Sequence, residues 1–501
     1  MPTLTINDQE VTVDQGTTVI EAAEKLGIHI PRYCYHPGLS LAGSCRMCLV
    51  EIEKIPALQI SCYTLAQDGM KVSTESTRVT DARKAMLEFL LSNHPLDCPV
   101  CDQSGECDLQ NFYMEFGRYD SRFLEDKVKK KKAFQIGPHV MLDQERCILC
   151  TRCIRFTEEV SKSDELGVFN RGGSSVIDLY PGKQLDNPYS GNVVDICPVG
   201  ALTEREFRFQ CRVWYLETQD SICNGCARGC NISVHFNTSR AYKAGGKRVL
   251  RVKPRYNAEV NQWWICDQGR FGYEFVNKNR LETPLLSGAS GLGWSSWDDA
   301  LSRGARAIRD SLDSLGTDGV GVVVSPQLSN EELQLAHELF VTKLELTNIA
   351  LQNPWESTGE DDDFLKRADL NPNSRGARDI GFKGEARGLL ERAASGQIKV
   401  LYIFWHDFNS EEAAELLRKM ECIIYQGVTW NQTAELAHVV LPGATHVEKD
   451  GTFTNFEGRI QSFNQALLPV GEARSDTEIL LSLAEKLGHR LSVSVKEEAA
   501  V

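Results

Sequence analysis

The cysteines of this chain constrain its fold and chemistry more than any other feature. Three of them, Cys147, Cys150 and Cys153, are separated by two residues each. A fourth, Cys197, directly precedes Pro198 after a long intervening segment. Three thiolates on one tight loop match three corners of an iron–sulfur cubane, and a distant Cys-Pro supplies the fourth. Structural zinc sites usually take their ligands as separated pairs, so the spacing favours a four-iron cluster over zinc.

The distribution of the other cysteines indicates further metal sites. The chain has 501 residues and 17 cysteines, and all but Cys422 lie between residues 34 and 266. Disulfides of a secreted protein would be spread more evenly, so this distribution favours metal binding in a reducing compartment. We call Cys147, Cys150, Cys153 and Cys197 the third ligand set, because two sets precede it in the chain and one follows.

The first ligand set lies in a predicted β-grasp domain over residues 1–77. Two short alternating runs flank the turn residues Asn7 and Asp8, and a helical pattern follows that ends on Gly27. A Cys-x-x-Cys pair flanked by two single cysteines gives each iron of a two-iron cluster two thiolates. The plant-type ferredoxin spacing is not met, and a four-cysteine zinc site is the alternative. The four residues are Cys34, Cys45, Cys48 and Cys62.

The second ligand set combines one imidazole with three thiolates. It follows a predicted helix over residues 78–92 and comprises His94, Cys98, Cys101 and Cys107. A zinc site with three cysteines and one histidine explains this spacing nearly as well as a cluster, and His94 is alternatively an ordinary histidine at a helix end. The position between two predicted clusters favours a four-iron cluster, in which an imidazole in place of a thiolate removes negative charge.

The fourth ligand set lies in a segment, residues 213–280, that is predicted to be rich in β-strands. Three closely spaced cysteines and a distant one again match a four-iron cluster, with a zinc ribbon as the alternative. The residues are Cys223, Cys226, Cys230 and Cys266. The four sets leave only Cys211 and Cys422 unassigned, which would be improbable if most of the cysteines were structural.

Two groups of cationic residues stand near these ligands. Arg146, Arg152 and Arg155 are interleaved with the third set, where positive charge would stabilise a reduced cluster; solvent-facing side chains are the alternative. The basic run KVKKKK, residues 127–132, is predicted to be a solvated connector, with a docking contact to an acidic partner as the alternative.

The charge and hydropathy of the chain exclude some functions. The net charge of −14 argues against nucleic acid or an anionic membrane surface as the main partner. No apolar stretch reaches the length of about 18 residues that a membrane helix needs, and the first residues are polar. We therefore expect a soluble, unexported, cytoplasmic protein.

From about residue 281 the sequence predicts an α/β layer domain with a parallel sheet. Apolar strand patterns such as GVGVVVSP and KVLYIFWH alternate with helical patterns such as EEAAELLRKM.

The stretch SGASGLGW lacks the order of a dinucleotide fingerprint and is predicted to be a loop. The acidic triplet Asp361, Asp362 and Asp363 is predicted to be a solvated loop rather than a catalytic group. In the first half of the chain, the segment SGNVVDICPVGAL is predicted to form an apolar, strand-like run directly before Cys197.

Four motifs of the first half resemble the large iron–sulfur subunit of bacterial NADH:quinone oxidoreductase, complex I. They are CRMCLVE, HPLDCPVCDQSGECDLQ, CILCTRCIRF and NVVDICPVGAL. The resemblance covers about the first 280 residues. It implies one two-iron cluster in the first ligand set and one four-iron cluster in each of the other three, the last lying off the main electron path.

The rest of the chain is similar to molybdopterin oxidoreductases through NQTAELAHVVLP and EKDGTFTNFEGRIQ. It departs from that family in its short length and in Gln268, where a lysine commonly stands between cluster and pterin. We expect no molybdopterin, and we expect Cys422 to be a buried structural thiol.

The predicted architecture is multidomain, α+β and α/β, in five parts. They are a two-iron β-grasp domain (1–77), a four-iron domain with one histidine and three cysteine ligands (78–132), a ferredoxin-like four-iron domain (133–212), a β-rich four-iron domain (213–280) and a reduced molybdopterin-oxidoreductase-like α/β domain (281–501).

The resemblance implies an electron relay between an NADH/FMN subunit and a quinone site, peripheral on the inner face of the cytoplasmic membrane through partner subunits. The chain shows no recognisable FMN, NAD or quinone site and no catalytic residue of its own. One alternative is the diaphorase subunit of a soluble NAD-linked hydrogenase or formate dehydrogenase, which shares the N-terminal modules. An alternative from another class is a zinc scaffold or a redox sensor.

Overall fold

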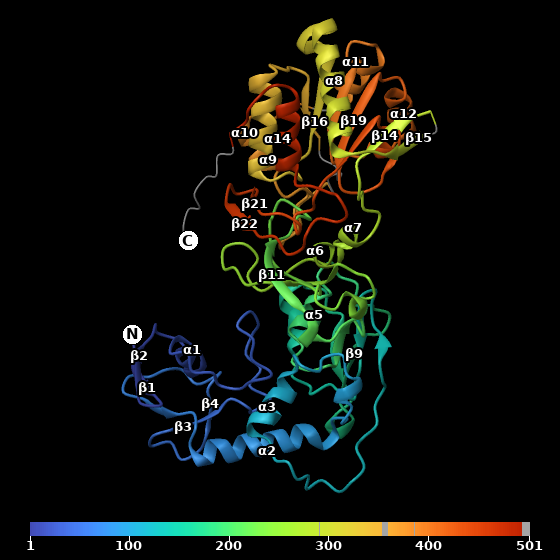
Figure 1. Cartoon of the computed structure of the whole chain (residues 1–501). Coiled ribbons are helices and arrows are strands. Elements are labelled where there is room, and N and C mark those ends of the chain that lie inside the picture. Colours follow the sequence, from blue (N-terminus) through green and yellow to red (C-terminus); the bar gives the residue numbers. More distant parts are fainter. Residues whose placement is uncertain (290, 353–358, 385, 493–501) are drawn as a thin grey trace. The chain divides into compact units, whose positions relative to one another are not determined.

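The computed structural model of the chain describes residues 1–289, 291–352, 359–384 and 386–492. The chain divides into two units, Met1–Leu216 and Glu217–Val501 (Figure 1). None of the helices in the described residues is both long enough and apolar enough to cross a bilayer.

The first unit begins with a five-stranded mixed sheet covered by one helix. Its strands are β1 (Thr3–Ile6), β2 (Gln9–Thr12), β3 (Leu49–Ile52), β4 (Gln59–Ile60) and β5 (Lys71–Ser73). They lie in the order β2-β1-β5-β3-β4, and β1 and β5 run parallel. Asn7 and Asp8 turn the predicted hairpin with positive φ angles of 47° and 64°, as a tight hairpin turn requires. Helix α1 (Val19–Lys25) starts at a capping box and packs its apolar face on the sheet.

Helix α2 (Thr77–Asn93) confirms the helix predicted over residues 78–92. The Ser76 side chain caps its start, and the helix ends where His94 takes an extended conformation before Pro95. A proline disfavours helical geometry in the residue before it, so the sequence itself ends the helix at the imidazole. A short 3-10 turn, η1 (Cys98–Val100), and helix α3 (Asp108–Phe116) follow.

The remainder of the first unit consists of small sheets joined by short helical turns. The three-stranded sheet has the order β10-β7-β6, and β8 and β9 form a separate hairpin. The elements are β6 (Phe134–Gln135), β7 (Val140–Leu142), α4 (Arg152–Arg155), the π-helical turn η2 (Phe156–Val160), β8 (Leu166–Phe169), η3 (Gly172–Ser174), β9 (Val176–Leu179), α5 (Asn192–Asp195), β10 (Leu202–Glu204) and η4 (Val213–Tyr215). The strand-like run predicted before Cys197 is wrong, because those residues form α5.

The second unit begins with an antiparallel sheet of three strands, in agreement with the predicted β-rich segment. Its elements are β11 (Glu217–Ile222), β12 (Asn231–Phe236), the 3-10 turn η5 (Ala241–Ala244), β13 (Val249–Pro254), α6 (Asp267–Phe271) and α7 (Glu274–Asn277). The loop between β11 and β12 and the start of α6 carry the fourth ligand set.

A seven-stranded sheet forms the rest of the second unit. Its strands are β14 (Leu285–Gly288), β15 (Gly291–Trp294), β16 (Val320–Val324), β17 (Ile349–Leu351), β18 (Val400–Phe404), β19 (Cys422–Gly427) and β20 (Val439–Pro442). Five of them run parallel in the order β17-β16-β18-β19-β20, which is the 2-1-3-4-5 order of a doubly wound sheet. The predicted parallel α/β domain is confirmed. The loop predicted at SGASGLGW is wrong, because β14 and β15 pair there as an antiparallel hairpin at the edge of the sheet.

Helices cover both faces of this sheet (Figure 1). One face packs on α8 (Trp297–Leu315), α9 (Asn330–Ala336), α10 (Ser374–Ile380) and α14 (Asp476–Lys486). The other packs on α11 (Ala386–Ala394), α12 (Glu411–Leu417) and α13 (Gln432–Leu436). The remaining elements are the turns η6 (Gly316–Gly319) and η7 (His337–Lys343) and the hairpin of β21 (Gly451–Thr454) and β22 (Ile460–Phe463). The acidic triplet at residues 361–363 lies outside helices and strands, as predicted.

Candidate metal centres

The third ligand set surrounds one apolar cavity. Its loop turns sharply because Leu149 and Thr151 have positive φ angles of 55° and 62°, and the Leu149 N–H donates to Cys147 Sγ at 3.4 Å. The cavity is lined by all four predicted thiols, by Arg152 and by six apolar residues: Leu142, Ile148, Ile177, Val199, Ala201 and Leu202. Four thiols that line one apolar cavity fit the donor set and the surroundings of an iron–sulfur cluster.

Burial opposes ionisation of these thiols in the absence of a metal. It raises the pKa of Cys147 to about 12 and that of Cys150 to about 11, and it raises the pKa of Cys153 and Cys197 as well. A thiolate is the form that binds a metal, so the positive charge of bound iron would have to offset this desolvation.

The first ligand set is arranged as two pairs of thiols. Cys34 is hydrogen-bonded to Cys45, and Cys48 is hydrogen-bonded to Cys62. Within each pair the hydrogen bond lowers the pKa of one thiol, Cys34 or Cys48, and raises the pKa of its partner, Cys45 or Cys62. Two neighbouring pairs fit a two-iron cluster, in which each iron takes two thiolates.

The second ligand set occupies the end of α2, the turn η1 and the start of α3. Buried His94 Nδ1 has no hydrogen-bond partner among the described residues, and burial lowers the pKa of this imidazole to about 4. The side chain is therefore neutral near pH 7 and has a free ring nitrogen, as a metal ligand requires. Cys107 and Cys101 lie close enough for their charges to interact, and Gly200 leaves room for Cys101, since a Cβ there would come within 2.4 Å of Cys101 Sγ.

All four cysteines of the fourth ligand set are buried. The Cys223 N–H donates to Cys230 O at 2.8 Å, which closes the loop between β11 and β12. Cys266 caps α6, and its sulfur accepts the Gly269 N–H at 3.3 Å, while Cys223 Sγ accepts the Gly225 N–H at 3.4 Å. Burial raises the pKa of all four thiols.

Gly269 packs directly against this set, and we expect Gly269→Ala to disturb it. A Cβ there would lie 2.9 Å from Cys223 Sγ and 3.3 Å from Ile265 Cδ1, so the substitution overpacks the ligand loop at a cost of about 1–3 kcal/mol. Iron analysis and EPR of the reduced protein should show the loss of one four-iron cluster. Gly293→Ala in β15, where a Cβ meets nothing within 4 Å, is the matched control. Full iron content in the Gly269 variant would contradict the expectation.

The zinc alternative requires ligands that converge on one ion. In the part of the chain that the structure describes, no three His, Cys, Asp or Glu side chains are placed to hold a single metal ion of any kind, so the donor types and not this arrangement favour a cluster over zinc.

The alternative that the three arginines near the third set face solvent is wrong. Arg146, Arg152 and Arg155 are only 4%, 8% and 7% exposed. Arg146 donates to Asp97 Oδ2 at 2.9 Å. The pKa of Asp97, which partial burial would raise, is lowered to about 2 because hydrogen bonds from Arg146 and Lys132 outweigh that effect. The sequence did not single out Asp97 or Gly200, although both belong to the quoted motifs.

Residues 127–132 lie outside helices and strands and Lys129, Lys131 and Lys132 are exposed, in agreement with the predicted solvated connector, but three of the lysines also bind other segments. Lys127 Nζ donates to Leu91 O at 2.6 Å, and Lys130 Nζ donates to Ser175 O at 2.6 Å. Lys132 Nζ lies 2.9 Å from carboxylate oxygens of both Asp97 and Glu145. The run thus ties the second ligand set to the segment that leads into the third.

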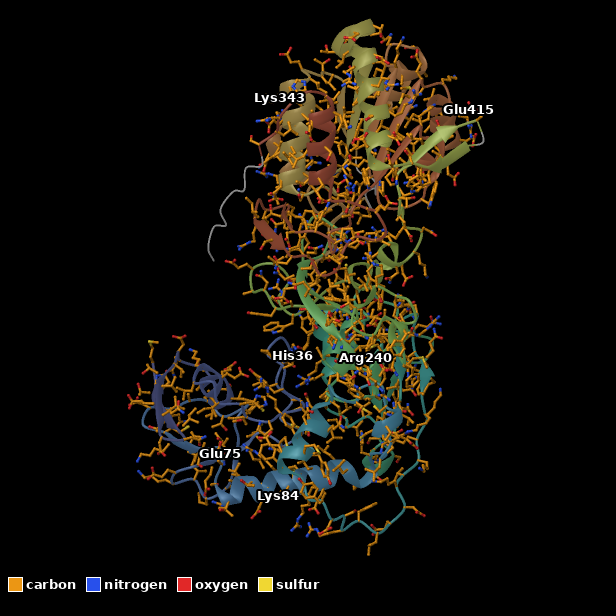
Figure 2. The ribbon with its side chains drawn as sticks, in the orientation of Figure 1. His36, Glu75, Lys84, Arg240, Lys343 and Glu415 are labelled. Atoms are coloured by element: carbon orange, nitrogen blue, oxygen red, sulfur yellow. The ribbon has the colours of Figure 1, made fainter. Side chains whose placement is uncertain are left out.

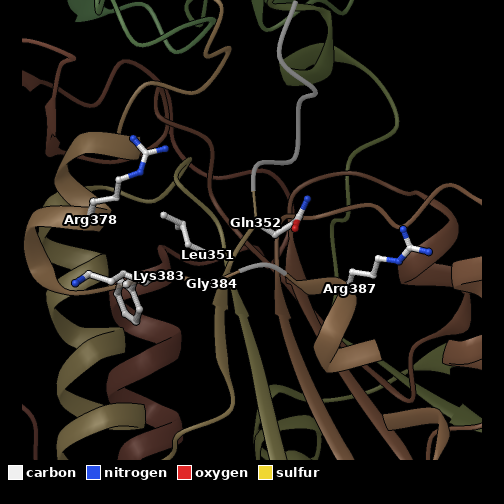
Figure 3. A pocket seen from close by; sticks show the side chains of 7 residues that line it. Leu351, Gln352, Arg378, Lys383, Gly384 and Arg387 are labelled. Carbon is white, nitrogen blue, oxygen red and sulfur yellow. The ribbon is translucent and has the colours of Figure 1, made fainter. Parts of the chain in front are cut away.

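The second unit also contains a pocket of about 650 Å³ beyond the carboxyl end of β17 (Figure 3). Its described lining includes the cationic residues Arg378, Lys383 and Arg387, together with Gln352. No thiol lines the described part of this pocket. Cys422, at the start of β19, is 5% exposed and belongs to the core of the sheet domain, where burial raises its pKa to about 11. The prediction that Cys422 is a buried thiol is confirmed.

Family models match most of the chain and define its class. The matches are a 2Fe-2S iron-sulfur cluster binding domain (residues 1–77), the NADH-ubiquinone oxidoreductase-G iron-sulfur binding region (83–122), the ferredoxin-like domain of NADH-quinone oxidoreductase subunit 3 (137–203), a molybdopterin oxidoreductase Fe4S4 domain (216–278) and molybdopterin oxidoreductase (346–486). Together with the thiol-lined cavity, these matches define an iron–sulfur subunit of an oxidoreductase.

Similar proteins identify the family within that class. The chain is 32% identical to the mitochondrial NADH-ubiquinone oxidoreductase 78 kDa subunit of Neurospora crassa, over 97% of this chain and 81% of the relative. It is 32% identical to a NADH-quinone oxidoreductase subunit of Rickettsia bellii (97% and 86%) and 30% identical to the NADH-ubiquinone oxidoreductase 75 kDa subunit of Reclinomonas americana (97% and 88%). The chain belongs to this family of complex I subunits, as the motifs indicated.

One solved structure is similar to part of the chain. It is a crystal structure of an NAD+-reducing [NiFe]-hydrogenase in the H2-reduced state, with 33% sequence identity and a TM-score of 0.38. The match covers 41% of this chain and 87% of the hydrogenase chain.

Proposed function

We propose that this chain is the iron–sulfur electron-relay subunit of NADH:quinone oxidoreductase and carries electrons from an NADH/FMN subunit towards a quinone site. The observation that carries the proposal is the apolar cavity lined by the four thiols of the third ligand set. Membership in the complex I family supplies the reaction that such a relay serves.

The proposal assigns one two-iron cluster to the first ligand set and one four-iron cluster to each of the other three. When bound, these clusters accept and release single electrons. The matched family models support this division, and we propose domain limits at residues 1–77, 78–132, 133–212, 213–280 and 281–501.

The side chains and backbone of this chain hold and tune the clusters. The thiols and His94 supply ligands, and the apolar lining of the third set excludes water. The N–H groups of Leu149, Gly225 and Gly269 donate to ligand sulfurs, and such hydrogen bonds stabilise added negative charge. Buried Arg152 and Arg155 add positive charge near the third set.

We further propose that the NADH/FMN-binding flavoprotein and other peripheral-arm subunits of complex I are the partners. Through them the chain would be held at the inner face of the cytoplasmic membrane, with only indirect membrane contact. The C-terminal domain would keep the molybdopterin-oxidoreductase fold without its metal chemistry, since Gln268 replaces the usual lysine and Cys422 is buried in a strand. Molybdenum in the purified complex, detected by elemental analysis, would contradict this.

Reconstitution of the isolated chain tests the relay. With iron and sulfide restored, reduction by dithionite should produce EPR signals of reduced clusters, because the ligands all come from this chain. The same sample should not oxidise NADH, because the proposal leaves the flavin to a partner. Robust NADH oxidation by the isolated chain would overturn the assignment.

The imidazole of the second ligand set gives a separate prediction. His94→Cys would add a negative thiolate, so we expect the reduction potential of this cluster to fall by roughly 100 mV or more, as the contrast between histidine- and cysteine-ligated clusters indicates. An EPR-monitored redox titration of the complex measures the shift. His139→Cys, at a half-buried histidine paired with Glu206 in the same unit, is the control. Unchanged potentials in the His94 variant would show that His94 is not a ligand.

A further inference from the structure

Two buried cations lie between the first and the third ligand sets. Arg152 and Arg155 belong to α4, which follows directly on the loop of the third set. Among the described residues neither guanidinium hydrogen-bonds to a carboxylate, and the Nε of each is buried without a hydrogen-bond partner. Buried charges are costly unless they are compensated, so these positions need a structural or functional reason.

Arg155 joins one ligand residue of each set. Its Nη2 donates to the carbonyl oxygen of Cys34 at 2.6 Å and to that of Cys150 at 3.3 Å. Its Nη1 donates to the carbonyl oxygen of Ser40 in the loop that follows Cys34. One planar group therefore holds the backbone of the first set against the backbone of the third.

Arg152 makes a second connection between the same segments. Its Nη2 donates to Tyr35 O at 2.6 Å, next to Cys34, and its Nη1 donates to Ile196 O at 3.1 Å, next to Cys197. The side chain also lines the cavity of the third set. A third connection comes from Ser40, whose N–H donates to the Glu159 carboxylate at 2.8 Å.

The loop between Cys34 and Cys45 contains no Asp or Glu that could pair with these cations. His36, labelled in Figure 2, is half-buried, and its Nδ1 accepts the Gly38 N–H at 3.1 Å. Both arginines hydrogen-bond to neutral carbonyls, and the Asp108 carboxylate near Arg152 offsets part of the charge of that residue. The charges of Arg152 and Arg155 act on Cys150, and that of Arg152 interacts with Cys34 and Cys197 as well.

We propose that Arg152 and Arg155 form a clamp that fixes the first ligand set against the third and supplies positive charge to both. Electron exchange between the two sites then occurs at a fixed separation, one site losing one electron as the other gains it. The inference rests on the proposed function and adds two positioning residues to it. A planar guanidinium suits this role because it can reach several carbonyls at once, which an ammonium group cannot do in the same geometry.

The experiment separates the charge from the geometry of the clamp. In the complex, Arg155→Met removes the positive charge and the planar guanidinium. Arg155→Lys and Arg152→Lys keep the charge but remove the guanidinium that reaches several carbonyls. Pulsed EPR measures the distance between the two reduced sites, and redox titration measures their potentials. Arg171→Lys, at an exposed arginine of the same unit, is the control.

We expect both lysine variants to broaden the distance distribution while the potentials change little. Arg155→Met should also lower the equilibrium constant for reduction of both sites by about tenfold, equivalent to ~59 mV for one electron. Iron content and thermal melting establish that each variant is loaded and folded. If the Arg155→Met chain fails to assemble into the complex, the distance distributions of the two lysine variants test the clamp.

Wild-type distances and potentials in all three variants would overturn the clamp. Absence of both clusters from the wild-type chain would instead refute the proposed function, so the two failures are distinguishable.

Discussion

Replacing Cys153 with alanine should remove one four-iron EPR signal and lower electron transfer through the complex by about 100-fold or more, since even outer partners of metal ligands are worth about 10–100-fold. Cys153 is 6% exposed and lines the cavity of the third ligand set with three other thiols. A methyl group cannot coordinate iron, and no unassigned cysteine lines that cavity to replace it. EPR of the reduced complex and NADH:quinone turnover are the measurements.

Cys422→Ala is the matched control for this prediction. Cys422 is equally buried but lies in the core of the sheet domain. Its substitution should leave every cluster signal in place and cost only packing energy. A Cys153→Ala complex with all its signals, or a Cys422→Ala complex that has lost one, would contradict the assignment of ligands.

Replacing Arg280 with methionine should destabilise the second unit by about 3 kcal/mol, because a buried carboxylate loses the more deeply buried of its two cationic partners and keeps only Arg248. Glu448 is 1% exposed, and its oxygens accept from Arg280 Nη1 at 2.9 Å and Nη2 at 2.7 Å. Arg248 forms a second ion pair with the same carboxylate. Urea unfolding of the full chain, followed by circular dichroism, measures the loss.

Arg375→Met is the control, since the pair of Arg375 with Asp379 is about half exposed and should contribute about 0–1 kcal/mol. Equal losses of unfolding free energy in the two variants would show that the buried pair contributes no more stability than the exposed pair.

The Arg280 pair also predicts a pH dependence. Burial opposes ionisation of Glu448, but the bonds and charges of Arg280 and Arg248 outweigh it, so the pKa of Glu448 is lowered from its ordinary value of 4.5. A lowered carboxyl pKa contributes stability that is present above about pH 4.5 and is lost as the pH falls further. Between pH 6 and pH 3, the wild-type chain should therefore lose more of this stabilisation than Arg280→Met, and parallel pH profiles of the two proteins would contradict this.

Patterns that depend on local rules were predictable from the sequence. Asn7 and Asp8 turn the first hairpin because they accept positive φ, and Pro95 ends α2 at His94. The alternation of apolar strands and helices was enough to predict the parallel sheet. The spacing of the cysteines also predicted the third ligand set, whose four members line one cavity in the structure.

Features that depend on tertiary contacts were not predictable in the same way. The residues before Cys197 have an apolar, strand-like pattern, yet they form the short helix α5. The run at residues 127–132 is basic enough for a solvated connector, but Lys132 forms ion pairs with Asp97 and Glu145, neither of which is its neighbour in the sequence. The same holds for Arg155, whose carbonyl partner Cys34 is 121 residues away.

The most direct test of the four ligand sets is the metal content of the purified chain together with its visible and EPR spectra. We predict a brown protein with about 14 iron atoms per chain, matched by acid-labile sulfide, and EPR signals of one two-iron and several four-iron clusters after reduction. A colourless protein that contains zinc in place of iron, or one whose cysteines are joined as disulfides, would contradict the electron relay proposed for this chain.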